Sequence, residues 1–215
     1  MDDAVDEPYA DVPVMLSVRD RRCVVVGGGG VGARRARTLS EAGAKVVMIA
    51  LQVHPSARLA GVRIEERAFQ PEDLDGALLV VVATDVEEIN DAVSEAAAER
   101  GVLVNRADRS EAGGLTFMTA HRDGPLTVAV HTGGASASAA TRIRALLVAD
   151  LDPAWGRLLA SALPVRRAIQ ERVRDPAKRV AMLRRLSDDR ALKTLRDGGE
   201  SALKGLYADI MKDLA

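Results

Sequence analysis

The sequence predicts an α/β protein built on a doubly wound parallel sheet, and two observations carry this prediction. Apolar runs without polar alternation, RCVVV at 22–26 and ALLVVVA at 77–83, are typical of strands covered on both faces. Segments in which apolar residues recur at helical spacing follow such runs along the chain. Regular alternation of strand and helix is typical of a parallel sheet with helices on both of its faces.

Local signals place the elements of this first part. Gly27 ends the first apolar run directly, and Gly43 stands where a helix commonly ends in a left-handed residue. Asp85 is placed to cap a helix in which Val86, Ile89, Val93 and Ala97 recur at helical spacing. We therefore expect strands at 22–26, 45–50, 62–66, 77–83 and 102–104, and helices at 31–43 and 85–100.

The pattern changes after about residue 114. The turn cluster 122–125 predicts a hairpin with strands at 116–121 and 126–131, and a helix is expected at 136–149. From Pro153 onward we expect helices, with breaks at Pro164, Pro176 and Gly198–Gly199. This predicts a nucleotide-type domain at 1–114, a small hairpin region at 115–150 and a helical domain at 151–215.

Composition excludes several classes of protein. The 215 residues hold 30 basic and 31 acidic side chains, and aromatic residues make up only 2%, which argues against a nucleic-acid partner. No apolar run approaches the about 20 residues that a membrane span needs. Cys23 is the only cysteine, which excludes an internal disulfide and fits a reducing compartment. We expect a soluble, cytoplasmic protein with no membrane partner.

A glycine-rich turn is the clearest chemical signal. Gly27, Gly29 and Gly32 form a Gly-x-Gly-x-x-Gly pattern that follows a predicted strand and opens a predicted helix. In this context the first glycine permits the tight turn, the second lets a pyrophosphate approach the backbone, and the third lets helix and strand pack closely. The helix N-terminus meets the anion with free N–H groups. The pattern therefore predicts dinucleotide binding by a Rossmann-type domain.

One part of this fingerprint is absent. An acidic residue should end the second strand and hold the adenosine ribose, yet residues 45–60 contain no carboxylate. Leu51 and Gln52 occupy the expected place, and backbone groups or Gln52 could hold the ribose. Spacing alone therefore leaves the choice between NAD and NADP open.

Two further candidates follow strands that end at the same sheet edge. Thr84 comes directly after the strongest strand and could face the cofactor. Asp108 follows the next strand, where a carboxylate can act as general base, orient a substrate or simply cap a turn. The histidines are far apart in sequence, so no metal site is predicted.

Read together, these segments resemble the precorrin-2 dehydrogenases, including the dehydrogenase/ferrochelatase part at the N-terminus of siroheme synthases. The matching stretches are PVMLSVRDRR at 13–22, VVVGGGGVGARRARTL at 24–39, VVATDVEEINDAVSEAAAERGVLVNRAD at 81–108 and FMTAHRDGPLTVAVHTGGASASAATRIR at 117–144. The resemblance implies oxidation of the tetrapyrrole precorrin-2 to sirohydrochlorin with NAD as hydride acceptor. It also implies a central dimerisation region, a homodimer and a helical C-terminal domain.

The resemblance also implies roles for single residues. Cofactor contacts fall on Gly30–Val31 and on Leu51–Gln52, and the family's important carboxylate falls on Asp108. His131–Thr132 stands where many relatives have a Ser-Ser pair. This departure leaves open whether the chain also inserts iron or cobalt into sirohydrochlorin. A non-catalytic NAD-sensing or tetrapyrrole-binding regulatory domain is the alternative function, and turnover would separate it from the enzyme.

Overall fold

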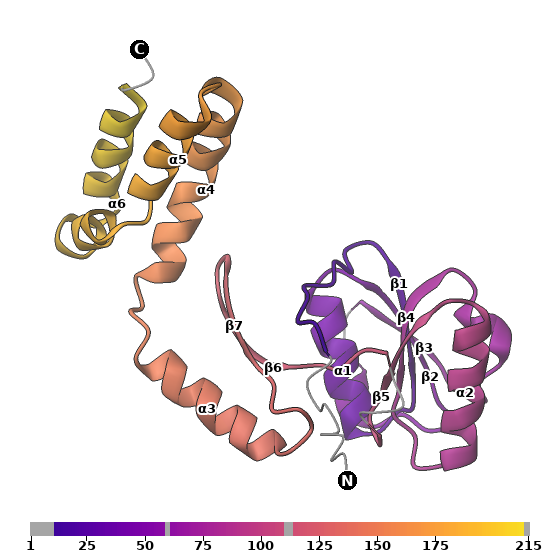
Figure 1. Cartoon of the computed structure of the whole chain (residues 1–215). Coiled ribbons are helices and arrows are strands. Elements are labelled where there is room, and N and C mark those ends of the chain that lie inside the picture. Colours follow the sequence, from indigo (N-terminus) through magenta and orange to yellow (C-terminus); the bar gives the residue numbers. More distant parts are fainter. Residues whose placement is uncertain (1–10, 59–60, 110–113, 213–215) are drawn as a thin grey trace, which may run out of the picture. The chain divides into compact units, whose positions relative to one another are not determined.

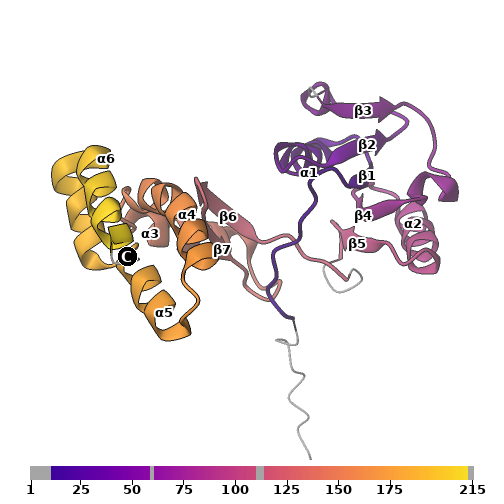
Figure 2. The ribbon, with the colours of Figure 1, turned by 90° about the horizontal axis from the view of Figure 1, so that it is seen from above.

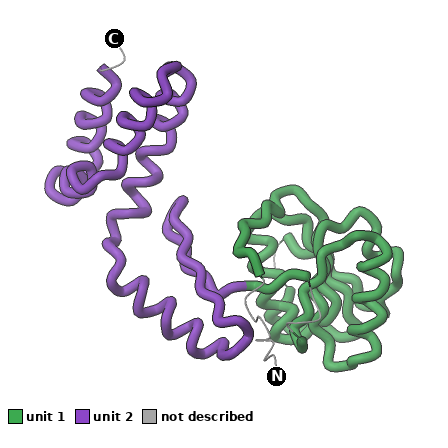
Figure 3. Tube along the Cα trace, in the orientation of Figure 1, with its two compact units in different colours: residues 1–117 green, residues 118–215 purple. Residues whose placement is uncertain are grey.

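The computed structural model describes residues 11–58, 61–109 and 114–212. The chain divides into two compact units, residues 1–117 and residues 118–215 (Figure 3). The predicted division into three domains stays a prediction. None of the helices in the described residues is long and apolar enough to cross a membrane.

The first unit contains a five-stranded sheet in which every pair of neighbouring strands is parallel. The strand order is β3-β2-β1-β4-β5, which Figure 2 shows from one edge to the other. The strands are β1 (Arg22–Val26), β2 (Lys45–Ile49), β3 (Val62–Glu65), β4 (Ala77–Val82) and β5 (Leu103–Arg106). The predicted fold class is therefore confirmed, and the predicted strands lie within two residues of the observed ones.

Two helices cover the two faces of this sheet (Figure 1). Helix α1 (Gly30–Glu41) packs Ala36 and Leu39 against the face that carries Val25. Helix α2 (Glu87–Glu99) packs Val93 against the opposite face, which carries Val24. Consecutive residues of β1 therefore point into different cores, which is why that strand is apolar from Cys23 to Val26. Short 3-10 helices η1 (Pro55–Ala57) and η2 (Pro71–Leu74) complete the unit.

Cys23 lies in the middle of this architecture. Its side chain is fully buried in β1 within the core beneath α1. Burial raises the pKa of the thiol to about 11, because the apolar surroundings disfavour the thiolate.

The start of α2 corrects one prediction. Asp85 does not cap the helix: the N-cap is Val86, and no side chain caps it. The Thr84 hydroxyl instead accepts a hydrogen bond from the Val86 N–H at 3.2 Å. The helix therefore begins at Glu87, two residues later than expected. Val86 and Ile89 are consequently exposed, whereas Val93 and Asn90 are buried.

The second unit begins with an antiparallel hairpin of β6 (Thr119–Asp123) and β7 (Leu126–Val130), as predicted. Gly124 has a φ of 56°, which the tight turn between the strands requires. Helix α3 (Ala137–Ala149) follows, and the Ser136 hydroxyl caps it by accepting a hydrogen bond from the Ala139 N–H at 3.1 Å. Hairpin and helix contact each other, yet of α3 only Ala140 is buried.

Three helices then form a separate hydrophobic core: α4 (Trp155–Arg172), α5 (Pro176–Arg185) and α6 (Asp189–Lys212). The predicted break at Pro164 is wrong, because Pro164 lies inside α4. Pro164 is exposed, while Leu158 and Ile169 on either side of it are fully buried and anchor the helix in its core. Gly199 has a φ of 66° and kinks α6 where a break was expected.

Candidate nucleotide-binding site

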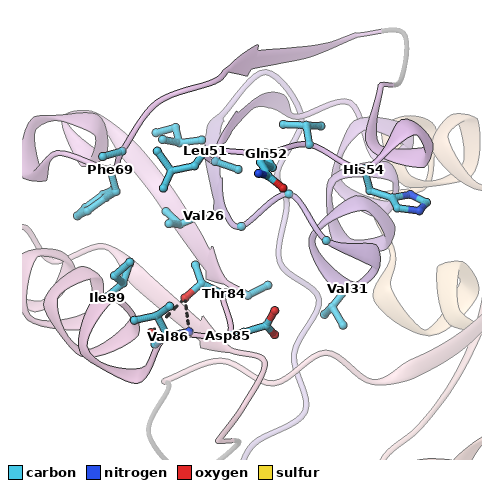
Figure 4. A pocket seen from close by; sticks show the side chains of 18 of the residues that line it. Val26, Val31, Leu51, Gln52, His54, Phe69, Thr84, Asp85, Val86 and Ile89 are labelled. Carbon is cyan, nitrogen blue, oxygen red and sulfur yellow. Dashed lines mark hydrogen bonds between the residues drawn. The ribbon is translucent and has the colours of Figure 1, made fainter.

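A pocket of about 840 Å³ lies at the carboxyl ends of β1, β2 and β4. In Figure 4, Phe69 and Ile89 lie on one side of it and Val31 and His54 on the other. Seven of the eight predicted cofactor-binding residues line it, namely Gly27, Gly29, Gly30, Val31, Leu51, Gln52 and Thr84. The edge of the sheet therefore gathers residues from three separate segments, as the parallel topology requires.

The glycine-rich turn is shaped by close backbone contacts. A Cβ on Gly27, whose φ is 116°, would lie 2.2 Å from the Ala83 carbonyl oxygen. A Cβ on Gly28 would lie 2.2 Å from the Gln52 carbonyl oxygen. Gly32 does not line the pocket, and its Cβ would lie 2.1 Å from the Gly27 carbonyl oxygen. Neighbouring backbone therefore excludes side chains at these positions.

Gly29 and Gly30, in the middle of the turn, have room for a side chain. A Cβ on Gly29 or Gly30 would have no heavy atom within 4 Å, so both residues face open space. Helix α1 begins there with Gly29 as N-cap, no side chain caps it, and its first turn carries no acidic residue. The free N–H groups of this helix start are suited to a phosphate group. The residues present therefore fit a dinucleotide pyrophosphate.

The segment after β2 forms another wall. Leu51 is 71% exposed, and Gln52 is exposed beside it. The His54 N–H donates to the Gly28 carbonyl at 2.8 Å, which ties this segment to the glycine turn. The His54 ring accepts a hydrogen bond from the Ser56 N–H at 3.2 Å through Nδ1. This end of the pocket therefore offers amide, imidazole and backbone groups in place of a carboxylate.

Phe69 forms the apolar wall, and an ion pair fixes the segment that carries it. Arg67 donates two hydrogen bonds to the Asp73 carboxylate, at 2.6 and 2.8 Å, and also contacts Glu65. Asp73 is 9% exposed, and the Arg67 guanidinium holds the pKa of its carboxyl below the usual range. Sequence reasoning missed Arg67, His54 and Phe69, since their approach to the pocket depends on tertiary packing.

A hydrogen-bonded chain leads away from the pocket through Asn90. The Thr84 hydroxyl lies 2.6 Å from Asn90 Oδ1, and Asn90 Nδ2 donates to the Thr84 carbonyl at 3.1 Å. The same Nδ2 donates to Asp108 Oδ2 at 3.1 Å. Asn90 is 1% exposed, so these partners satisfy a buried amide.

Asp108 is held from the other side by Arg106. Arg106 Nε donates to Asp108 Oδ1 at 2.8 Å, and Nη2 donates to Oδ2 at 2.7 Å. Arg106 also donates to Asp91 at 2.6 Å, and it is 4% exposed. The Arg106 guanidinium, helped by the Asn90 amide, holds the pKa of Asp108 well below its usual range, although partial burial opposes this.

Asp108 therefore does not line the pocket itself, but it is joined to the pocket residue Thr84 through a single side chain. Among the residues that the structure describes, no three His, Cys, Asp or Glu side chains gather where a metal ion could bind. The roles predicted for Asp108 and for the glycine turn stay predictions.

Comparisons with known proteins agree with this geometry. A family model described as "Putative NAD(P)-binding" matches residues 14–119. Siroheme synthase from Methylobacillus flagellatus is 38% identical over 165 residues, which cover 75% of this chain and 35% of the relative. Siroheme synthase from Thioalkalivibrio sulfidiphilus is 33% identical over 196 residues, covering 89% and 40%. The chain thus spans well under half the length of these curated relatives.

A solved structure titled "SirC, precorrin-2 dehydrogenase" has the same fold, with a TM-score of 0.74 and 23% sequence identity over 94% of this chain and 100% of that one. Fold, glycine turn and family model together define an NAD(P)-binding protein of the Rossmann class, which confirms the predicted cofactor, NAD. The family predicted from the sequence is also confirmed. The chain is similar to siroheme synthases over 75% to 89% of its own length, and its nucleotide-binding part matches the NAD(P)-binding family model.

Proposed function

We propose that this chain oxidises precorrin-2 to sirohydrochlorin with NAD as the hydride acceptor, in siroheme biosynthesis. The observation that carries the proposal is a glycine-lined pocket at the end of β4 together with a fixed carboxylate, Asp108, which follows the neighbouring strand β5 and lies outside the pocket lining. The siroheme synthases and the precorrin-2 dehydrogenase described above support it. No observation favours the alternative of a purely regulatory domain.

The pocket residues have distinct tasks in this proposal. Gly29 and Gly30 leave room for the pyrophosphate beside the start of α1. Gln52 is placed to hold the adenosine ribose, and Phe69 and Ile89 provide an apolar wall for the adenine ring. When bound, NAD supplies a nicotinamide ring that accepts a hydride.

Oxidation of precorrin-2 removes one hydride and one proton, and the chain must provide for the proton. Asp108 is our candidate acceptor. Its depressed pKa keeps it ionised at neutral pH, so it is always able to accept, and its side chain is 33% exposed. Arg106 and Asn90 fix the direction of the carboxylate oxygens. Positioning rather than high basicity is therefore what this site contributes.

The test is direct turnover. Purified protein mixed with precorrin-2 and NAD should form sirohydrochlorin and NADH in equal amounts, which absorbance spectra follow together. NADH formation that requires both protein and precorrin-2 would support the proposal. Tight binding of NAD without any turnover would instead favour a regulatory role.

We further propose that the protein is a homodimer through the hairpin and α3. A two-stranded hairpin is marginal by itself, and neither β6 nor β7 contains a fully buried residue. Ile143, Leu146 and Leu147 on α3 are 42%, 62% and 52% exposed. A second copy of the chain would cover this apolar face.

Insertion of iron or cobalt into sirohydrochlorin stays open. The Thr132 hydroxyl accepts from the Ser136 N–H at 3.2 Å and donates to the Ser136 carbonyl at 3.1 Å, so it organises the turn before α3. Incubating the protein with sirohydrochlorin and Fe²⁺ or Co²⁺, against a protein-free control, measures this activity separately.

A further inference from the structure

Among the described residues, Asn90 is the one side chain that hydrogen-bonds both Thr84 and Asp108 directly. It hydrogen-bonds both the hydroxyl and the carbonyl of Thr84, which lines the nucleotide pocket. It also donates to Asp108, which stands outside the pocket at the end of the neighbouring strand. We propose that Asn90 is a positioning residue that holds the pocket wall and the Asp108 carboxylate in one fixed arrangement.

The hydrogen bonds themselves fix how the amide is oriented. The Thr84 carbonyl and the Asp108 carboxylate can only accept, so the NH₂ group must face them both. The amide oxygen is then left for the Thr84 hydroxyl, which donates to it. Because the amide is buried and uses three of its four hydrogen-bonding positions, an inverted orientation would oppose acceptor to acceptor at two contacts.

Helix α2 supplies further support from the same face. The Ser94 hydroxyl donates to the Asn90 carbonyl at 2.8 Å. Asp91 accepts a hydrogen bond from Arg106, which also donates to Asp108. One helix therefore sets the position of the groups that follow both β4 and β5. Any change at Asn90 is expected to disturb Thr84 and Asp108 together.

The inference rests on the proposed function for its activity readout, but it also has readouts that do not depend on it. Among the described residues, the charged residues that contact Asp108 or its partner Arg106 are Arg106 on β5, Asp91 on α2 and, through its backbone N–H, Arg109 in the loop. Arg109 pairs in turn with Glu87 at the start of α2. Asn90→Asp leaves these groups in place but adds a carboxylate beside Asp108, so the titration of Asp108 in this variant reports the lost amide contact and the added charge together.

Asn90→Asp is the sharpest variant because it keeps the shape and removes the donor. At neutral pH it places a second carboxylate against Asp108 and the Thr84 carbonyl. We expect turnover to fall at least about tenfold and the dissociation constant of NAD to rise by about three- to tenfold, the loss of one or two hydrogen bonds in a buried site. As the pH falls, protonation of the new carboxyl restores one donor, so the activity relative to wild type should recover partly.

Val93→Ala is the matched control. Val93 is fully buried one turn further along α2, and its aliphatic side chain can make no hydrogen bond to these polar groups. It should lower stability without changing the relative pH profile. Thr84→Val and Thr84→Ser form a second pair. The valine variant removes the hydroxyl that donates to the Asn90 amide oxygen, and the serine variant keeps it. Only the valine variant should change the titration of Asp108.

The deciding experiment makes three measurements on wild type and on each variant. These are turnover as a function of pH, NAD affinity by calorimetry and the titration of Asp108 by carbon-detected NMR. If wild type shows no turnover, the proposed function fails, yet NMR and calorimetry still test Asn90. The inference is overturned if Asn90→Asp matches wild type in NAD affinity and in the Asp108 titration. It is also overturned if its defects only parallel those of Val93→Ala.

Discussion

Arg106 and Asp108 form a two-point ion pair in which Nε meets Oδ1 at 2.8 Å and Nη2 meets Oδ2 at 2.7 Å. The two residues are separated by one position at the end of β5, so the pair is local in sequence. It nevertheless joins two parts of the fold, because Arg106 is buried and also binds Asp91 on α2. The pair thus gives the carboxylate a fixed direction.

Replacing Asp108 separates binding from chemistry. Asp108→Ala and Asp108→Asn should leave the dissociation constant of NAD nearly unchanged, because Asp108 does not line the pocket. Sirohydrochlorin formation should fall by about 10²- to 10⁴-fold, the usual worth of a general acid or base. Steady-state turnover and calorimetry on the same preparations check this. Wild-type turnover in both variants would make Asp108 a turn residue.

The pH dependence of turnover should show no loss of activity caused by Asp108 between about pH 8 and about pH 5. The pKa of this carboxyl lies well below its usual range because of Arg106, so the group stays ionised throughout that window. Its contribution to stability is likewise present above the unfolded pKa and disappears only as the pH falls through the folded value. A titration of Asp108 near neutral pH, seen by NMR, would contradict this.

Gly29→Asp should abolish NAD binding while the protein stays folded. A Cβ on Gly29 would meet no heavy atom within 4 Å, and the φ of this residue is −76°, so the backbone accepts a side chain. The added carboxylate would occupy the anion position at the start of α1. Calorimetry measures the affinity and circular dichroism the fold. Gly29→Ala is the matched control and should weaken binding less, since it adds no charge.

Asp73→Asn should lower the free energy of unfolding by about 1–3 kcal/mol at neutral pH, because Arg67 loses a charged partner in a buried setting. The pKa of Asp73 is lowered in the folded state, so its contribution is present above about pH 4 and shrinks as the pH falls further. Urea unfolding at about pH 7 and about pH 3 tests both parts. Asp75→Asn, which breaks only an exposed pair with Arg100, should cost under about 1 kcal/mol.

Leu146→Arg should weaken the proposed dimer. The side chain is 62% exposed within the chain, so the substitution is tolerated in the monomer but places a charge on the apolar face of α3. Light scattering at micromolar concentration should show the mass of a dimer for wild type and a monomer for the variant. Val180→Arg, at an exposed position on α5, should leave the mass unchanged. A monomeric wild type would refute the dimer.

The sheet could be predicted because its signals are local. The strands β1, β2 and β4 are largely apolar runs, and the structure places all five predicted strands within two residues of the prediction. The start of α2 could not, because the Thr84 hydroxyl rather than Asp85 turns the chain there. Nor could the continuity of α4 through Pro164, which depends on core contacts made by Leu158 and Ile169.

The candidate site could likewise be predicted only in part from the sequence. The glycine turn is a contiguous pattern, so sequence alone located it. Phe69 reaches the pocket only through the turn after β3. The pairing of Asn90 with Asp108 spans 18 positions and depends on how α2 lies against β5. The pairing of Arg106 with Asp108, by contrast, spans only two positions and is local in sequence.

The position of Cys23 makes the single thiol a reporter of opening of the first unit. A fully buried thiol with a pKa of about 11 reacts with an alkylating reagent only after the surrounding strands separate, since the thiolate is the reactive form. The labelling rate under native conditions therefore measures how often β1 becomes accessible. A ligand that binds the folded unit slows this rate in proportion to its occupancy, so alkylation of one atom can rank dinucleotides without any enzymatic assay.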